Sequence, residues 1–193
     1  MTLLFLRHGQ TDWNARGLVQ GRTDIPLNAT GRAQAWERAV ELMRHQPPVE
    51  IIYASPLLRA KETAEIIQQA LGVPLRFDER LVECGFGKLE GVSRTQLAGG
   101  SVFGHWAAVG EAEFLRQGAE SLYALYERVG DFLDAVGARH AGQTVLVVAH
   151  GGVGHMAHWF FHGRDETDPA KYGNAILRTY TAKLAGDRPV FTG

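Results

Sequence analysis

Short apolar runs alternate with longer helix-like segments along this chain of 193 residues, and the alternation limits the fold more than any other feature. The runs are residues 2–6, 51–54 and 144–149, with a brief one at 75–77 and a last one at 176–182. Continuous apolar runs of this length are typical of strands buried on both faces of a sheet. Strands that alternate with helices predict an α/β fold, in which helices flank a mostly parallel sheet in three layers.

Four helices are expected between these runs, at about residues 30–46, 56–72, 121–140 and 152–161. Thr30 is the expected N-cap of the first helix, and a proline pair ends it. The apolar face of that helix is expected to carry Trp36 and Met43, widened by the smaller residues Ala35, Ala39 and Leu42. Trp159, on the last helix, is expected in the core.

The segment from about 84 to 118 lacks a clear period and contains eight glycines, so we expect an irregular, cap-like excursion with short helical pieces. Its aromatic residues Phe103, Trp106 and Phe114 fit two interpretations. They form a small satellite core under a long loop, or they line a ligand pocket as an apolar wall. The chain length favours one domain, so residues 1–193 are expected to form a single domain with this excursion.

The charged residues nearly cancel, with 20 Lys and Arg against 21 Asp and Glu, for a net charge of −1. This balance gives no general attraction for nucleic acid or an anionic membrane, so neither is an expected partner. No apolar run reaches the ~20 residues of a membrane span, and the apolar start is too short for a secretory signal. The single cysteine, Cys84, excludes an intrachain disulfide and fits a reducing compartment. We therefore expect a cytoplasmic protein, whose oligomeric state the sequence does not indicate.

Two places in the chain share one layout, in which a histidine and then a glycine follow a buried strand. They are residues 6–9 (Leu-Arg-His-Gly) and residues 149–152 (Ala-His-Gly-Gly). Ligands of open parallel sheets bind at the carboxyl ends of the strands, where adjacent strands bring both histidines together. The glycines allow a ligand close to the backbone, and the amides that open the helix after Gly151 favour an anion. A lone histidine at a strand end is more often structural, whereas the pair indicates a site.

Two arginines and a glutamate add to this pair. Arg7 adjoins His8, and a buried arginine is costly without an anion or carboxylate partner. Arg59 follows the second expected strand, and from the first turns of the next helix it reaches the same edge of the sheet. Taken alone, Arg59 fits a solvated helix residue better. Glu83 precedes a glycine-rich turn and becomes a candidate proton donor only where it faces the histidines.

Residues 6–14 (Leu-Arg-His-Gly-Gln-Thr-Asp-Trp-Asn) closely resemble the signature of the histidine phosphatase, or phosphoglycerate mutase-like, superfamily. The chain also resembles later motifs of that family, in the family's order, at residues 20–27, 31–35, 55–64, 81–91, 118–121, 148–152 and 173–175. An isolated Arg-His-Gly would mean little, but this ordered set is specific and spans nearly the whole chain. The resemblance implies the phosphoglycerate mutase-like fold and a phosphatase that needs no metal and no cofactor.

Carried over by position, the resemblance implies that His8 is the nucleophile and Glu83 the general acid and base. Arg7, Arg59 and His150 complete the phosphate pocket, with His150 expected to be charged. Further substrate contacts are implied for four residues: Asn14, Gln20, Gly21 and Gly151.

The chemistry of a phosphate monoester fits these residues. Such an ester carries close to two negative charges, which two guanidiniums match bidentately. Neutral His8 forms a covalent phosphohistidine, and Glu83 protonates the leaving oxygen and then deprotonates water. The expected function is hydrolysis of a small-molecule phosphate monoester, whose identity the sequence does not give. Two alternatives are a cofactor-dependent phosphoglycerate mutase and, less favoured because the site residues are all present, an inactive phosphate-binding module.

The chain departs from the family pattern in two places. His155 stands where many members have arginine, so a cation is missing on the carboxyl-terminal side of the pocket. Gly85 stands where the family often has histidine, which leaves a wider substrate mouth. His155, His158 and His162 recur at helical spacing, but no acidic residue joins them, so we expect a plain helix face and no metal site.

Overall fold

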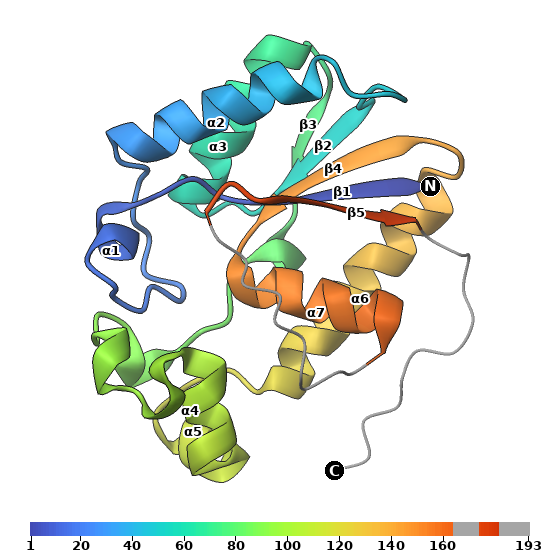
Figure 1. Cartoon of the computed structure of the whole chain (residues 1–193). Coiled ribbons are helices and arrows are strands. Elements are labelled where there is room, and N and C mark those ends of the chain that lie inside the picture. Colours follow the sequence, from blue (N-terminus) through green and yellow to red (C-terminus); the bar gives the residue numbers. More distant parts are fainter. Residues whose placement is uncertain (164–173, 182–193) are drawn as a thin grey trace.

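Five strands form one sheet in the order β3-β2-β4-β1-β5 in this computed structural model, which describes residues 1–163 and 174–181 (Figure 1). The strands are β1 (Thr2–Arg7), β2 (Ile51–Ala54), β3 (Leu75–Phe77), β4 (Thr144–Ala149) and β5 (Leu177–Thr181). Strands β1 to β4 pair in parallel, and β5 pairs with β1 in the antiparallel direction. The expected mostly parallel α/β sheet is confirmed.

Helices cover both faces of this sheet, which gives three layers (Figure 1). The helices are α1 (Asp12–Ala15), α2 (Ala29–Leu42), α3 (Leu58–Leu71), α4 (Val102–Val109), α5 (Glu111–Arg116), α6 (Leu122–Arg139) and α7 (Gly151–His162). Four short 3₁₀ turns are η1 (Glu79–Leu81), η2 (Gly87–Leu89), η3 (Arg94–Gln96) and η4 (Ala98–Gly100). Within the described residues, no helix combines the length and apolar character needed to cross a bilayer.

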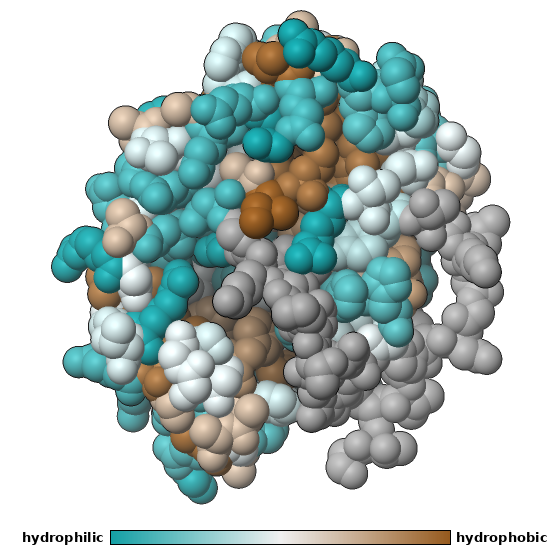
Figure 2. Space-filling model, viewed as in Figure 1, coloured by the Kyte–Doolittle hydropathy of each residue, from teal (hydrophilic) through white to brown (hydrophobic). Residues whose placement is uncertain are grey.

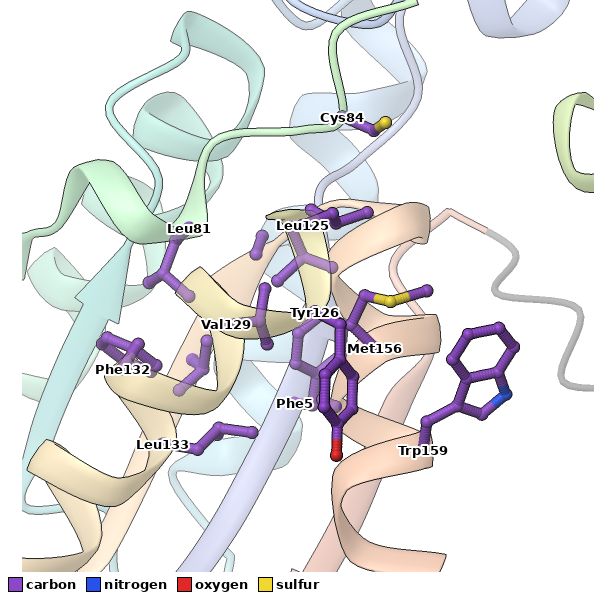
Figure 3. Close-up of a cluster of buried hydrophobic side chains, with 14 of the residues drawn as sticks. Phe5, Leu81, Cys84, Leu125, Tyr126, Val129, Phe132, Leu133, Met156 and Trp159 are labelled. Carbon is purple, nitrogen blue, oxygen red and sulfur yellow. The ribbon is translucent and has the colours of Figure 1, made fainter. Parts of the chain in front are cut away.

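The side chains of β1 alternate between two cores, as the two-residue period of a strand requires. Leu4 and Leu6 join the cluster under α2 and α3. Leu3 and Phe5 join the larger cluster under α6 and α7, where Figure 3 shows Phe5 among side chains of these two helices. Burial on both faces explains why the strand is apolar without a break.

Helix α2 buries only part of the apolar face that was predicted for it. Trp36 is 56% exposed, and the buried positions include Ala35, Ala39 and Leu42. These three positions form a stripe at helical spacing, and the alanines let α2 approach the sheet and α3 closely. The predicted face also included Trp36, whose side chain faces solvent instead. The surface over α2 is mostly hydrophilic (Figure 2). Met43, which we also expected to be buried, is 60% exposed, whereas Trp159 is buried as predicted.

The N-cap of helix α2 lies two residues earlier than predicted. Its N-cap is Asn28, whose side chain accepts a hydrogen bond from the amide of Gly31. Thr30 lies inside the helix. Both residue types cap helices well, and the backbone position of Asn28 decides between them.

The excursion after Glu83 contains α4, α5 and three of the 3₁₀ turns, consistent with the short helical pieces expected there. Its aromatic residues divide between the two interpretations. Phe114 is fully buried in the core under α6 and α7. Phe103 lines a cavity described below. Trp106 packs against the core and hydrogen-bonds Glu111.

Candidate functional site

The two histidines lie side by side because their strands are neighbours. β1 and β4 pair with Arg7 opposite Ala149, so His8 and His150 leave the sheet at the same edge. Their ring centroids are 5.2 Å apart. The adjacency predicted from the two strand–histidine–glycine motifs is confirmed.

An open cavity of about 550 Å³ lies at this edge of the sheet. Its wall contains most of the residues that the sequence put forward: Arg7, His8, Gln20, Gly21, Arg59, Glu83 and Gly151. Two of the predicted residues, His150 and Asn14, do not line it.

His8 is buried in one defined tautomer. Its Nδ1 lies 2.7 Å from the carbonyl oxygen of Gly9. Since a carbonyl oxygen can only accept, Nδ1 carries the hydrogen and Nε2 keeps its lone pair. Burial, together with the nearby Arg59 and Arg7, lowers the pKa of His8 well below its ordinary value of 6.5. His8 is therefore neutral at pH 7, which is the state that a nucleophilic imidazole needs.

The buried guanidinium of Arg59 and the half-buried side chain of Arg7 provide positive charge beside His8. Arg59 donates from Nη1 to the carbonyl of Thr23 at 3.0 Å and from Nη2 to that of Gly21 at 2.7 Å. Its Nε is buried and has no hydrogen-bond partner among the described residues. Burial lowers the pKa of Arg7 to about 10, so this side chain stays charged at pH 7. The cavity thus concentrates positive charge in a chain whose net charge is −1.

His150 lies against His8 and is fully buried. Its Nε2 is 2.7 Å from Oγ of Ser55, and its Nδ1 has no hydrogen-bond partner among the described residues. Burial, with Arg59 next in importance, lowers the pKa of His150 well below 6.5. The prediction that His150 is charged is therefore wrong for this state of the site, because strand order places it among other cations and away from water.

The carboxylate of Glu83 is held by two backbone amides. Its Oε1 accepts from the amide of Cys84 at 2.9 Å, and its Oε2 accepts from that of Gly152, at the start of α7, at 3.1 Å. Glu83 thus lines the same cavity as His8, next to the start of α7, and its role as a proton donor stays a prediction. The nearby carboxylates Glu90 and Glu120 do not line the cavity.

Gly152 is a glycine because Glu83 occupies the space of a side chain. A Cβ at this position would lie 2.4 Å from Oε1 of Glu83. We expect Gly152→Ala to displace this carboxylate and to lower kcat/KM at least ~10-fold, since a 1 Å displacement of a reacting group costs up to about 100-fold. Gly151→Ala is the matched control, because its Cβ would make only ordinary contact, at 3.8 Å, with Arg7. Equal losses in the two variants would contradict the steric explanation.

The two neutral histidines make stability depend on pH. Their pKa values are lowered on folding, so below pH 6.5 the unfolded chain binds protons that the folded chain does not. This stabilising contribution is complete above pH 6.5 and is lost as the pH falls toward the folded-state pKa values. Each histidine adds at most about 1.4 kcal/mol of unfolding free energy per pH unit to this dependence.

Urea denaturation between pH 5 and 7 measures this effect. We expect the unfolding free energy to decrease as the pH is lowered from 7 to 5. The decrease should be less steep in His8→Asn, whose amide can still donate to the Gly9 carbonyl. Identical slopes in the variant and the wild type would show that His8 is not a buried neutral group.

Asn14 stabilises the loop that follows β1 through its side-chain hydrogen bonds. Its Oδ1 accepts from the amide of Thr11, which caps α1, and from Nδ2 of Asn174. Asn174 also donates to the carbonyl oxygens of His8 and Gly9 at 3.2 Å and lines the cavity. Direct contact of Asn14 with substrate stays a prediction. The role of Asn174 in holding the His8 backbone was not predicted, because it depends on the pairing of β5 with β1.

Two further residues, Arg94 and His155, line the part of the cavity that is available to the leaving group of an ester. Arg94 lines the cavity and is close enough to Arg7 to contribute to its lowered pKa. His155, found where many family members have arginine, stacks on Phe103 with centroids 4.7 Å apart. Gly85, the other departure, does not line the cavity and lies beside the Arg22 side chain. The sequence pattern gave no signal for the position of Arg94 in the cavity.

Comparison with known proteins agrees with this geometry. The sequence model of the family described as histidine phosphatase superfamily (branch 1) matches residues 3–192 of this chain. "Putative phosphoserine phosphatase 2" of Hydrogenobacter thermophilus is 38% identical over 155 residues, covering 79% of this chain and 74% of that protein. "Phosphoglycerate mutase-like protein 4" of Arabidopsis thaliana is 33% identical over 154 residues, covering 78% of this chain and 66% of that protein.

Solved structures show the same fold. A phosphoserine phosphatase from Entamoeba histolytica, in complex with 3-phosphoglyceric acid, superposes with a TM-score of 0.74 at 28% identity. The match covers 93% of this chain and 90% of that one. The chain belongs to the histidine phosphatase superfamily.

Proposed function

We propose that this protein hydrolyses phosphate monoesters through a phosphohistidine formed on His8. The observation that carries the proposal is the state of this side chain: neutral, with Nδ1 bound to the Gly9 carbonyl and Nε2 free, in the wall of an open cavity. A neutral imidazole beside two guanidiniums is equipped to attack a bound dianion. The names of the relatives support phosphatase activity.

The charge of the ester is offset by Arg7 and Arg59. A phosphate monoester carries close to two negative charges at pH 7 and repels nucleophiles until that charge is neutralised. The carbonyls of Gly21 and Thr23 fix the plane of the Arg59 guanidinium, so little reorganisation is needed when phosphate binds. His150 contributes a second imidazole, whose ring centroid lies 5.2 Å from that of His8.

Glu83 handles the proton in both steps. In the first, Nε2 of His8 bonds to phosphorus, the ester P–O bond breaks, and Glu83 gives its proton to the departing oxygen. In the second, Glu83 takes a proton from water as the water oxygen bonds to phosphorus. The P–N bond then breaks, which releases inorganic phosphate and returns His8 and Glu83 to their starting states.

Hydrolysis is favoured over the mutase alternative by the charges of the excursion. A mutase holds a bisphosphate while it reorients, which needs a second anion site. Between Val92 and Gly118 the arginines are Arg94 and Arg116. Arg116 pairs with Glu113 on the surface, so of these two arginines only Arg94 adds positive charge to the cavity wall.

The cavity suits a small organic phosphate whose leaving group carries a carboxylate. Arg94 offers a guanidinium for an anion, and Val19, Phe86 and Phe103 form apolar wall. A phosphorylated hydroxy or amino acid matches both features, and several relatives and solved structures bear the name phosphoserine phosphatase.

A panel of phosphate monoesters, with and without a carboxylate in the leaving group, tests this proposal. We expect phosphate release with the highest kcat/KM on a small phosphorylated acid. In parallel, 3-phosphoglycerate is supplied with catalytic bisphosphoglycerate, and its isomerisation is followed through enolase. Isomerisation faster than the best hydrolysis rate would favour the mutase, and no turnover of any ester would favour the inactive module.

Activity should be unchanged by EDTA, because Arg7 and Arg59 supply the positive charge that Mg²⁺ supplies in many phosphoryl-transfer enzymes. Within residues 1–163 and 174–181, no three His, Cys, Asp or Glu side chains gather as a metal site. The assay is phosphate release before and after chelation. Loss of activity that a divalent ion restores would contradict the metal-free mechanism.

A further inference from the structure

The backbone carbonyl of Glu83 is held by two arginines outside the cavity. Arg128, on α6, donates from Nη2 to this oxygen at 3.2 Å, and Arg22 donates from Nε at 3.4 Å. Glu83 needs such support because residues 82–86 form neither helix nor strand. Regular secondary structure therefore does not fix the backbone from which its carboxylate extends.

Glu120 ties both arginines together. Its Oε1 and Oε2 accept from Nε and Nη2 of Arg128, each at 2.9 Å, and Oε1 lies 3.1 Å from Nη2 of Arg22. The backbone of Glu120 also donates to the Gly85 carbonyl at 2.7 Å. Burial opposes ionisation of Glu120, but Arg128 outweighs it and lowers the pKa of this carboxyl. The fork-to-fork geometry makes the Arg128–Glu120 pair strong and directional.

Arg128 also connects this pair to the element before Glu83. Its Nη1 donates to the carbonyl of Arg80, in η1, at 2.7 Å. One guanidinium thus joins α6, the turn before Glu83 and the segment after it. Neither Arg128 nor Glu120 lines the cavity, so neither is placed to contact substrate.

We propose that Arg128 and Glu120 are positioning residues, which hold the Glu83 backbone so that its carboxylate reaches the leaving oxygen. This inference rests on the proposed role of Glu83 as general acid. Reacting groups must be held to within about 0.5 Å of their productive geometry by such supporting contacts. Loosening the pair should therefore impair proton donation while leaving phosphate binding by Arg7 and Arg59 intact.

Leaving-group dependence separates this role from a merely structural one. The variants are Arg128→Gln and Glu120→Gln, and kcat/KM is measured on glycerol phosphate and on p-nitrophenyl phosphate. The first ester needs protonation of its leaving oxygen and the second hardly does. We expect Arg128→Gln to lose at least ~10-fold more on glycerol phosphate than on p-nitrophenyl phosphate. Inhibition by inorganic phosphate should stay within about threefold of wild type.

Glu120→Gln should show the same pattern more weakly, because its amide oxygen still accepts from Arg128 without the charge. This variant keeps the side-chain size and carries the test if Arg128→Gln does not fold. Arg116→Gln is the matched control, since it breaks an arginine–glutamate pair on the exposed surface of α5, and it should lose nothing on either ester. Equal losses of kcat/KM on the two esters would overturn the positioning role. So would a weakening of phosphate inhibition as large as the loss of kcat/KM.

Glu83→Gln serves as the reference that keeps the two claims apart. If Glu83→Gln discriminates between the esters and the two positioning variants do not, this inference fails and the proposed function stands. If Glu83→Gln itself does not discriminate, the general-acid role fails first, and the inference that depends on it fails with it.

Discussion

Replacement of His8 by alanine should lower kcat by more than about 100-fold on every phosphate monoester, because the covalent route is lost with its nucleophile. The side chain is neutral and buried between Arg7 and Arg59, and its Nε2 is the unprotonated imidazole nitrogen of this residue. The guanidiniums remain in the variant, so inorganic phosphate should still bind. The expected result is a protein that binds phosphate and turns over almost no ester.

The fold should survive this substitution. The Nδ1 bond of His8 goes to the carbonyl of the adjacent Gly9, so its loss affects only a local contact. The thermal transition and phosphate inhibition of His8→Ala are measured beside kcat. A folded variant that keeps more than about 1% of wild-type kcat would show that another group is the nucleophile.

Glu83→Gln should produce the next largest loss, and its size should depend on the leaving group. General acid catalysis contributes about 10²–10⁴-fold when the leaving oxygen is basic. We expect a loss in this range on glycerol phosphate and a far smaller one on p-nitrophenyl phosphate. Glutamine keeps the shape of the side chain but cannot donate the proton. It also loses one of the two acceptors of the backbone amides, and the rate on p-nitrophenyl phosphate measures that second effect.

Glu113→Gln is the control for this pair of assays, because Glu113 is a carboxylate on α5 that pairs with the exposed Arg116. It should leave both rates unchanged. Equal losses on the two esters in Glu83→Gln would contradict the acid role. Glu90 and Glu120 are not ready substitutes, since neither lines the cavity.

The sheet and the position of the site follow from local sequence patterns. A strand buried on both faces must be apolar throughout, so 2–6 and 144–149 are recognisable without any partner. A histidine and a glycine directly after each strand then mark one edge of the sheet. These signals lie within a few residues of each other, which is why they survive in a single sequence.

The exposure of Trp36 on α2 was not predicted, because side-chain size is a poor guide to burial where helices approach closely. Alanines at 35 and 39 bury little surface each, yet they set how near α2 lies to α3 and the sheet. Trp36 has more apolar surface to bury, but its helical position points it outward, where it is 56% exposed. Periodicity identifies a helix, and only the packing partner decides which stripe is buried.

The supporting contacts of the site were beyond prediction because they join distant segments. Arg128 reaches Glu83 across 45 positions, and Asn174 reaches His8 across 166. The neutral state of His150 likewise depends on how many cations the fold gathers around it. Residue type and spacing identified the groups that react, whereas the groups that hold them became visible only in three dimensions.

The most direct test of this account is detection of the phosphoenzyme itself. Wild-type protein is mixed with a phosphate monoester, quenched within the first turnover under alkaline denaturing conditions, digested and analysed by mass spectrometry. We predict one phosphoryl group, labile to acid and stable to base, on the peptide that contains His8, and none in His8→Ala. Turnover of the ester with no phosphorylated histidine at any quench time, or a phosphoryl group on a residue other than His8, would contradict the account.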